Sequence, residues 1–165
     1  MLVPHPVNAN TSTTVPLTPA FTSIRRTRRR YGETVIGYEW RGRFDNAELN
    51  RVHAEAFGHR PTDDDWWGQV NRHSLGWSCA RLRGRLVGFV NVAWDGGVHA
   101  ILLDPIVVPS LQRHGIGGSL VSQAVEHARS AGCEWLHVDF DDHLRAFYLQ
   151  RCGFRATGAG LIRLR

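Results

Sequence analysis

The chain has 165 residues, which is enough for one domain with a buried core. Hydrophobic residues make up 42% of it and six are tryptophan, as expected of a globular protein. No uninterrupted apolar run approaches the roughly 20 residues of a transmembrane helix, which excludes an ordinary membrane-spanning segment.

The net charge of +5 is located at the N-terminus. Residues 1–32 contain five arginines and no acidic residue, whereas residues 33–165 contain 15 arginines and 15 acidic residues. We therefore expect residues 1–32 to form a flexible, arginine-rich extension and residues 33–165 to form the folded domain. Because that domain is formally neutral, it lacks the charge excess typical of nucleic-acid binding.

The chain has three cysteines, at positions 79, 133 and 152. Their odd number and their spacing fit neither a disulfide framework nor a metal site, which indicates reduced thiols. The N-terminal residues also lack the basic-then-apolar pattern of a secretory signal. Together these observations predict a cytoplasmic location.

The first half of the domain begins with a predicted strand at 34–40 and a helix that starts at Asp45 or Asn46 and ends at Gly58. A loop rich in aspartate then leads into a short helix through Val70. At its start, Trp66 and Trp67 allow two interpretations. They are either core aromatics behind a capped helix, or part of a site for an ammonium-bearing substrate.

Three strands follow as an antiparallel meander, at 75–81, 86–94 and 99–108. The glycine-containing turns 83–85 and 95–97 connect them. Pro105 cannot donate a ladder hydrogen bond, so we expect the third strand of the meander to be interrupted there.

The segment 107–120 runs from an apolar strand through a glycine-bearing turn into an amphipathic helix that ends at Gly132. Unpaired N–H groups and the helix dipole make such a helix N-terminus an anion site, and phosphate is its usual ligand. The turn lacks the Gly-Lys-Ser/Thr ending of a Walker phosphate-binding loop, and its glycines do not have the spacing of a dinucleotide-binding fingerprint. A strand at 135–140, a helix from Asp141 or Asp142 to Gly153, and a closing hairpin of strands 154–156 and 161–164 complete the prediction.

The spacing Gln112-x-x-Gly115-x-Gly117 resembles the signature of the GNAT superfamily of N-acetyltransferases. The interruption at Pro105 and the helix end Phe147-Tyr148 to Gly153-Phe154 are similar to features of the same family. The resemblance covers residues from about 33 to 165. It implies an α/β fold with a mixed sheet of about seven strands and four helices, in which strands four and five splay around a coenzyme A site.

The resemblance also implies acetyl-CoA as the cosubstrate, with no metal. By position, the donor-binding residues would lie along the interrupted strand and in the turn that follows it: Ile106, Val107, Val108, Gln112, Arg113, His114, Gly115, Ile116, Gly117, Gly118 and Ser119.

For catalysis, the resemblance implies that Tyr148 is the acid beside the sulfur and that Val107 or Val108 supplies a backbone donor. Asp104 is the first candidate for the base. Asp139 and His137 are further candidates for a proton relay, and we expect only one of them to face the cleft. Four residues separate Tyr148 from Gly153 where the family has three, which leaves the direction of Tyr148 open unless a π-bulge absorbs the insertion.

The sequence therefore predicts transfer of an acetyl group from acetyl-CoA to a primary amine of a small molecule, peptide or protein. Two alternatives stay open. One is an enzyme that acetylates aminoacyl-tRNA, and the other is a non-catalytic module that binds acyl-CoA and regulates. Trp66, Trp67 and Asp139 are the candidates for acceptor binding, and the sequence is compatible with a homodimer.

Overall fold

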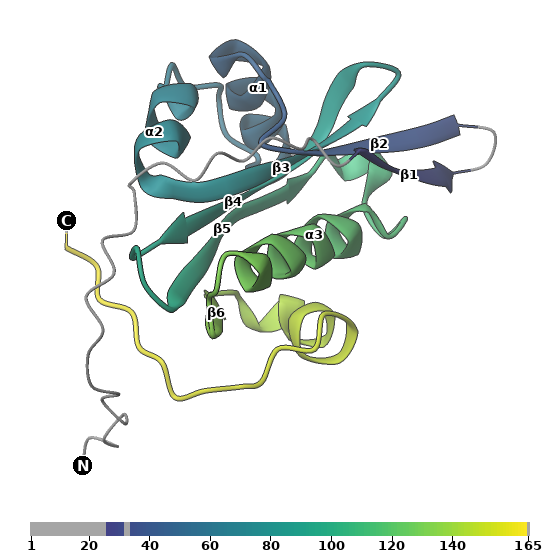
Figure 1. The fold of residues 1–165 in the computed structure, drawn as a ribbon. Helices are drawn as coiled ribbons and strands as arrows, with labels where there is room; N and C mark the ends of the chain where they lie inside the picture. Colours follow the sequence, from purple (N-terminus) through teal and green to yellow (C-terminus); the bar gives the residue numbers. More distant parts are fainter. Residues whose placement is uncertain (1–25, 32–33, 165) are drawn as a thin grey trace.

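The computed structural model of the chain describes residues 26–31 and 34–164. Its centre is a six-stranded sheet in the order β1 to β6, antiparallel except for the parallel pair β5–β6 (Figure 1). The strands are β1 (Arg26–Tyr31), β2 (Thr34–Trp40), β3 (Ser74–Leu82), β4 (Arg85–Trp94), β5 (His99–Val107) and β6 (Trp135–Val138).

Helices cover both faces of this sheet. The first two helices, α1 (Asn46–Phe57) and α2 (Trp66–His73), lie on one face, and α3 (Ile116–Ser130) lies on the other (Figure 1). None of the helices in the described part of the chain is long and apolar enough to span a bilayer. The arrangement confirms the predicted mixed α/β sheet.

The ends of α1 follow from its capping residues. The Asp45 carboxylate accepts the Glu48 backbone N–H at 2.6 Å, which satisfies one of the unpaired donors of the first turn. At the other end, Gly58 adopts a left-handed conformation with φ of 71°, which reverses the chain and ends the helix. The predicted bounds of this helix are confirmed.

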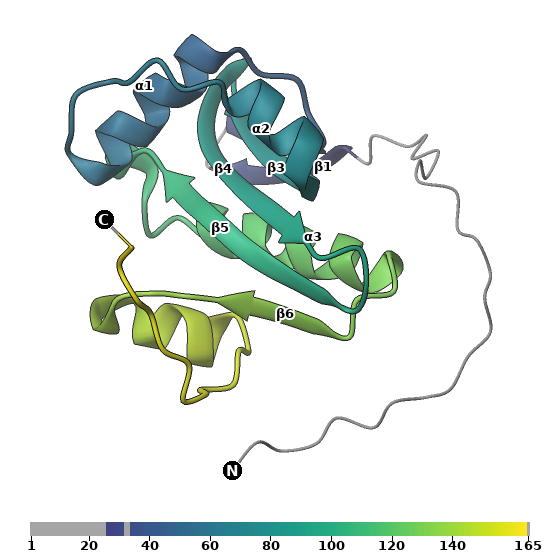
Figure 2. The same cartoon turned by 90° about the vertical axis from the view of Figure 1, so that its left-hand side faces the viewer.

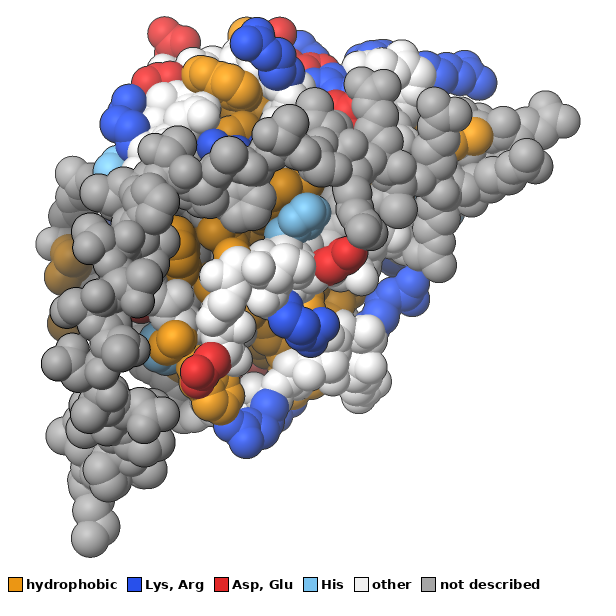
Figure 3. All heavy atoms as spheres, viewed as in Figure 1, with side chains coloured by type: hydrophobic (Ala, Val, Ile, Leu, Met, Phe, Trp, Pro, Cys, Tyr) orange, Lys and Arg blue, Asp and Glu red, His pale blue; other side chains and the backbone are white. Residues whose placement is uncertain are grey.

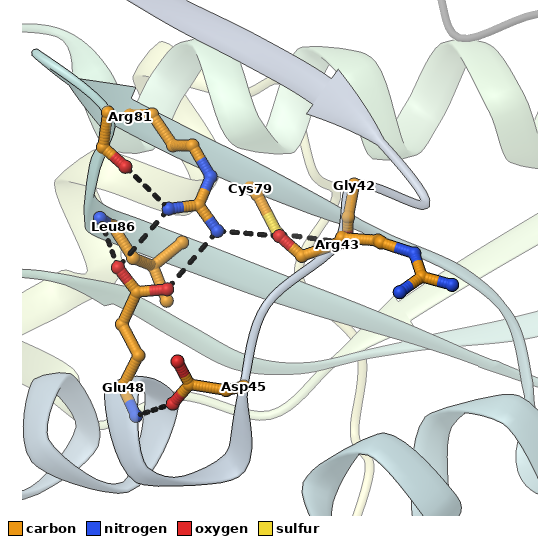
Figure 4. Close-up of polar contacts among 8 residues, drawn as sticks. Gly42, Arg43, Asp45, Glu48, Cys79, Arg81 and Leu86 are labelled. Carbon is orange, nitrogen blue, oxygen red and sulfur yellow. Dashed lines mark hydrogen bonds and ion pairs between the residues drawn. The ribbon is translucent and has the colours of Figure 1, made fainter.

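A charged network joins α1 to the β3–β4 hairpin (Figure 4). Both Glu48 carboxylate oxygens accept from the Arg81 guanidinium at 3.2 Å, and one also accepts the Leu86 backbone N–H at 2.9 Å. Arg81 donates further to the Arg43 carbonyl at 2.6 Å. Because the Arg81 and Glu48 side chains are only 19% and 16% exposed, this bidentate pair fixes α1 against the sheet.

The predicted meander is confirmed as β3, β4 and β5. Its last strand is interrupted where Pro105 predicts it. Leu103 lies opposite Asn91 and Ile106 lies opposite Phe89, so two residues of β5 face a single residue of β4. This is a β-bulge, and Asp104 within it has φ of 50°.

Beyond the bulge, β5 and β6 separate. Residues 99–102 of β5 pair with residues 135–138 of β6, and β5 then continues to Val107 without this partner. Figure 2 shows the two strands diverging toward their carboxyl ends. The predicted splaying around the motif is therefore present.

Three expectations need correction. First, β1 lies inside the segment 1–32, so part of the predicted extension belongs to the sheet. Residues 1–25 lie outside the described residues.

Second, the predicted closing hairpin is wrong, because the described residues after Gly153 form no strand. Leu161, Ile162 and Leu164 are exposed. An apolar run forms a strand only where a partner strand pairs with it, and these residues have no such partner among the described residues. Third, the sheet consequently has six strands, where the sequence predicts about seven.

The predicted helix after Asp142 also differs in kind. A 3₁₀ turn at Asp142–Leu144 is followed by a π-helix at Ala146–Arg151. The Cys152 N–H bonds to the Phe147 carbonyl, five residues back, at 3.0 Å. The π-helix absorbs the extra residue before Gly153, as the sequence allows.

Candidate functional site

A cavity of about 490 Å³ lies where β5 separates from β6. Its walls come from β5, from the turn and first residues of α3, and from the π-helix: Pro105, Ile106, Val107, Gln112, Arg113, Gly115, Gly117, Gly118, Leu120, Leu144, Ala146, Phe147, Tyr148 and Arg151. Seven of the eleven predicted donor-binding residues are among them.

The turn at one end of the cavity is built by backbone conformation. Gly115 has φ of 84° immediately before α3, which favours glycine over any other residue, and Arg113 has φ of 61°. The Gln112 side-chain amide donates to the Val107 carbonyl at 3.1 Å and so fixes the turn to the end of β5. The first N–H groups of α3 lack intrahelical acceptors, and no acidic residue lies in this first turn.

Glycines leave space above this helix end. A Cβ at Gly118 would lie 3.2 Å from Nε of Arg151, and one at Gly117 would lie 3.4 Å from the Phe147 ring. Arg151 therefore adds a positive charge beside the N-terminus of α3. Arg151 is not identified from the sequence, because it is far from the motif in the chain and only the fold brings the two together.

The end of β5 presents one backbone donor to the gap. The Val108 N–H bonds to the Val87 carbonyl of β4 at 2.9 Å, so it points away from the cavity. Because successive strand residues point their N–H groups to opposite edges, the Val107 N–H points into the gap. Val107 lines the cavity and Val108 does not. Of the two candidate donors, the structure thus favours Val107.

Tyr148 lines the cavity from the π-helix and is 2% exposed. Its ring stacks on Phe140 at 4.8 Å between centroids and makes edge contacts with Phe147 and Phe154. Burial raises the pKa of the Tyr148 hydroxyl to about 12, so the hydroxyl keeps its proton at neutral pH. A protonated phenol at this position can donate a hydrogen bond or a proton.

Asp104 lies at the bulge, next to Pro105 in the cavity wall. Burial raises the pKa of its carboxyl group, and the nearby His53 of α1 lowers it. Asp104 itself is not among the residues that line the cavity, whose wall begins at Pro105.

The other predicted donor-binding residues have different surroundings. Ile116 is buried in the core, and the Ser119 hydroxyl bonds back to the Gly115 carbonyl at 3.2 Å. His114 is exposed in the turn, outside the cavity wall. These residues shape the turn and the start of α3.

The candidate acceptor residues are not brought to the cavity. Trp66 is buried and donates its indole N–H to Asn50 at 2.9 Å, while Trp67 packs edge-on against Phe44 and Trp77. This placement favours the interpretation as core aromatics over the ammonium site. Asp139 follows the end of β6 and is exposed.

His137 and Asp139 are both exposed, and residues two positions apart along a strand share a face. The expectation that only one of them faces the cleft is therefore unsupported. His137 instead pairs with His99 of β5, with 2.8 Å between ring nitrogens.

Charge on the visible described surface in Figure 3 is dispersed. On the face shown in Figure 3, the described arginine side chains are spread apart, with acidic side chains between some of them. Among the described residues, no group of three histidine, cysteine or acidic side chains is arranged to hold a metal ion.

A cavity between two splayed strands, ending at a glycine turn and a helix N-terminus, defines an acetyltransferase-like architecture. The chain belongs to the acetyltransferase (GNAT) family, which matches residues 36–154. The chloroplastic GCN5-related N-acetyltransferase 3 of Arabidopsis thaliana is 32% identical over 104 residues. That match covers 62% of this chain and 42% of the relative, so the chain spans less than half of the relative's length.

Solved structures share the fold. An acetyltransferase of Trypanosoma brucei superposes with a TM-score of 0.65 at 22% identity, covering 78% of this chain and 99% of that one. A GNAT-family acetyltransferase of Streptococcus pneumoniae gives 0.63 at 22%, covering 79% and 99%. The aminoglycoside N-acetyltransferase AAC(6')-Iy, solved in complex with CoA, gives 0.63 at 15%, covering 80% and 95%.

Proposed function

We propose that this protein transfers an acetyl group from acetyl-CoA to a primary amine. The observation that carries the proposal is the cavity in which the gap between β5 and β6 meets the N-terminus of α3. An extended thioester with an anionic end fits this combination of an apolar slot and an anion site.

The donor would lie along the cavity. Its pyrophosphate would accept from the N–H groups at the start of α3, with the guanidinium groups of Arg113 and Arg151 nearby. The pantetheine arm would run along Ile106 and Val107, where the backbone of β5 lacks a partner strand. The thioester would then reach the bulge at Asp104.

The reaction has three requirements, and this chain has a candidate group for each. The amine must lose a proton, for which Asp104 is the candidate base from the sequence. The oxyanion that forms on the thioester carbonyl needs a donor, which the Val107 N–H supplies. The leaving thiolate needs an acid, which the protonated Tyr148 hydroxyl supplies.

The competing functions are less well supported. Recognition of tRNA would need a basic face, whereas residues 33–165 carry 15 arginines and 15 acidic residues, and the described arginines on the face in Figure 3 are spread apart. The excess of arginine lies in β1 and in the residues before it. A non-catalytic module is suggested by the extra residue before Gly153. The π-helix removes this reason, because it keeps Tyr148 in the cavity wall.

The direct test is thiol release from acetyl-CoA over a panel of polyamines, aminoglycosides and peptides with free N-termini. We expect amine-dependent release with at least one class, together with an acetylated amine detected by mass spectrometry. Thiol release no faster than hydrolysis with every amine, despite CoA binding, would contradict the proposal.

A pair of arginine variants links the activity to the cavity. Arg151→Gln removes the charge beside α3 and should raise the KM for acetyl-CoA about tenfold, since one charge-assisted contact to phosphate is lost. Arg155→Gln is the matched control, because Arg155 lies over the Trp135 ring outside the cavity wall. Equal KM values for the two variants would argue against this placement of the donor.

A further inference from the structure

A chain of hydrogen bonds lies behind Asp104, on α1 and the loop that follows it. Nδ1 of His53 is 2.9 Å from Nε2 of His59, and Nδ1 of His59 is 2.7 Å from the Arg60 carbonyl oxygen. The left-handed Gly58 produces this arrangement, because it ends α1 and brings His59 back beside His53. The His59 N–H bonds to the Ala54 carbonyl at 3.1 Å and holds the turn.

This chain determines which nitrogen of His53 carries the proton. A carbonyl oxygen only accepts, so Nδ1 of His59 must be the donor to Arg60. In neutral His59 the other nitrogen, Nε2, is then an acceptor, and Nδ1 of His53 donates to it. Nε2 of His53 is left as the basic nitrogen, and no described residue makes a hydrogen bond to it.

The loop that carries His59 is firmly attached to α1. Asn50 of α1 is buried, and its side chain accepts from the Trp66 indole at 2.9 Å and from the Thr62 hydroxyl at 2.8 Å. It also donates to the Asp64 carbonyl at 3.0 Å. The orientation of the two histidines therefore does not depend on a loose loop.

The position of His53 fits the acceptor side of the reaction. It lies on α1, which packs against β5 on the face of the sheet opposite α3 (Figure 1). The charge of Asp104, at the bulge of β5, raises the pKa of His53, and a charge on His53 lowers that of Asp104. The donor cavity opens on the α3 side and reaches Pro105, the neighbour of Asp104. An amine that attacks a thioester at the bulge from the opposite side would meet His53.

We propose that His53 is the catalytic base of the acetyl transfer, with His59 as the positioning residue that holds its Nε2 unprotonated. This deepens the proposed function and rests on it. Nε2 takes one proton from the ammonium form of the acceptor, and the freed nitrogen lone pair bonds to the thioester carbon while the carbonyl electrons move onto the oxygen. When the C=O bond forms again, the C–S bond breaks and the thiolate takes the proton of the Tyr148 hydroxyl. The nitrogen loses its second proton, which returns through solvent to the Tyr148 phenolate, and the imidazolium releases the first proton to solvent.

The charges around His53 suit this role. Burial lowers its pKa below the usual 6.5, as does a charge on the neighbouring His59, while the carboxylates of Asp104 and Asp64 raise it. The net direction is downward, so His53 is neutral and basic at pH 7. The rings of Phe57 and Trp66 pack against it at 4.7 and 5.2 Å between centroids and account for its partial desolvation.

The test compares His53→Gln with His73→Gln, a control at the exposed end of α2. Loss of a general base lowers the rate by about 100-fold. We expect that loss in kcat for His53→Gln, with unchanged CoA affinity by calorimetry showing that the fold is intact. His73→Gln should behave as wild type. A His53→Gln enzyme within about threefold of wild-type kcat would overturn the proposal.

The pH profile separates a base from a structural residue. In wild type, kcat/KM should rise with pH through an inflection below 6.5, and His53→Gln should lose this inflection. Asp104→Asn removes a charge that raises the pKa of His53, so the inflection should move to lower pH. An inflection that survives in His53→Gln would assign the base to another group.

A spectroscopic measurement tests the hydrogen-bond chain without any turnover. Nitrogen NMR of ¹⁵N-histidine-labelled protein, assigned with His53→Gln, should show His53 protonated on Nδ1 at pH 7, and His59→Ala should shift it toward the Nε2–H form. Wild-type protein with Nε2–H on His53 would overturn the inference even if acetyl transfer occurs. If the tautomer is as expected but no amine is acetylated, it is the proposed function that fails.

Discussion

The two faces of the sheet use different means of recognition at the same bulge. On the α3 side, the cavity depends on backbone: a left-handed Gly115, unpaired helix N–H groups and the free edge of Val107. On the α1 side, the proposed acceptor site would act through the side chains of Asp104, His53 and His59, which come from β5, α1 and the loop after α1. The proposed donor site can thus be identified from residue spacing within one short segment, whereas the proposed acceptor site is assembled from residues that are distant in the chain.

The largest expected effect breaks the donor side alone. Gly118→Asp places a Cβ 3.2 Å from Arg151 and a carboxylate beside the proposed pyrophosphate site. Repulsion between like charges should weaken CoA binding about 100-fold in calorimetry. Gly158→Asp is the control, because a Cβ there meets no atom within 4 Å. Similar CoA affinities for both variants would show that the N-terminus of α3 does not bind the pyrophosphate.

Tyr148→Phe should separate chemistry from binding on the donor side. The ring keeps its contacts with Phe140 and Phe154, so the KM for acetyl-CoA should change little, while kcat falls about 100-fold with the lost acid. Because burial raises the pKa of this hydroxyl to about 12, Tyr148 stays protonated and active through neutral pH and loses its proton only as the pH approaches that value. An unchanged kcat in Tyr148→Phe would contradict its role.

The attachment of α1 can be tested as a matter of stability. Arg81→Met leaves the Glu48 carboxylate without its bidentate partner in a half-buried setting, and should lower the free energy of unfolding by about 2–3 kcal/mol in urea titrations. Arg72→Met removes the ion pair with Asp65, whose two side chains are 62% and 63% exposed. This substitution should change the free energy of unfolding by less than about 0.5 kcal/mol. Equal losses would show that the Arg81 network does not hold α1 to the sheet.

The smallest effect should come from the π-helix. Deleting Gln150 removes the extra residue before Gly153 and should convert the π-turn to α while Tyr148 stays in the cavity wall. We expect kcat within about threefold of wild type. A loss of tenfold or more would mean that the π-helix does more than absorb an insertion.

Most of the fold was predictable because its signals are local. Asp45 and Gly58 mark the ends of α1, Pro105 marks the bulge, and the spacing from Gln112 to Gly117 marks the turn before α3. The closing hairpin was mispredicted, because its apolar residues resemble a strand while pairing depends on a partner that sequence does not reveal.

The acceptor side was less predictable for a related reason. Asp104 is predictable because it lies close to the motif in the sequence, whereas His53 lies in α1, far from that motif in the chain and outside any motif. Nothing in the spacing of residues 53, 59 and 104 relates them to one another. The turn at Gly58 brings His59 beside His53, and the packing of α1 on β5, to which the Glu48–Arg81 pair contributes, brings His53 under the electrostatic influence of Asp104 (Figure 4).

The most direct test of this account is a crystal structure with acetyl-CoA bound. We predict that the pyrophosphate lies on the N-terminus of α3 and that the thioester lies in the gap between β5 and β6. The Tyr148 hydroxyl should be within hydrogen-bond distance of the sulfur, and His53 should be on the opposite side of the acetyl group. A cofactor bound outside this gap, or a sulfur beside Leu149 with Tyr148 turned away, would contradict it.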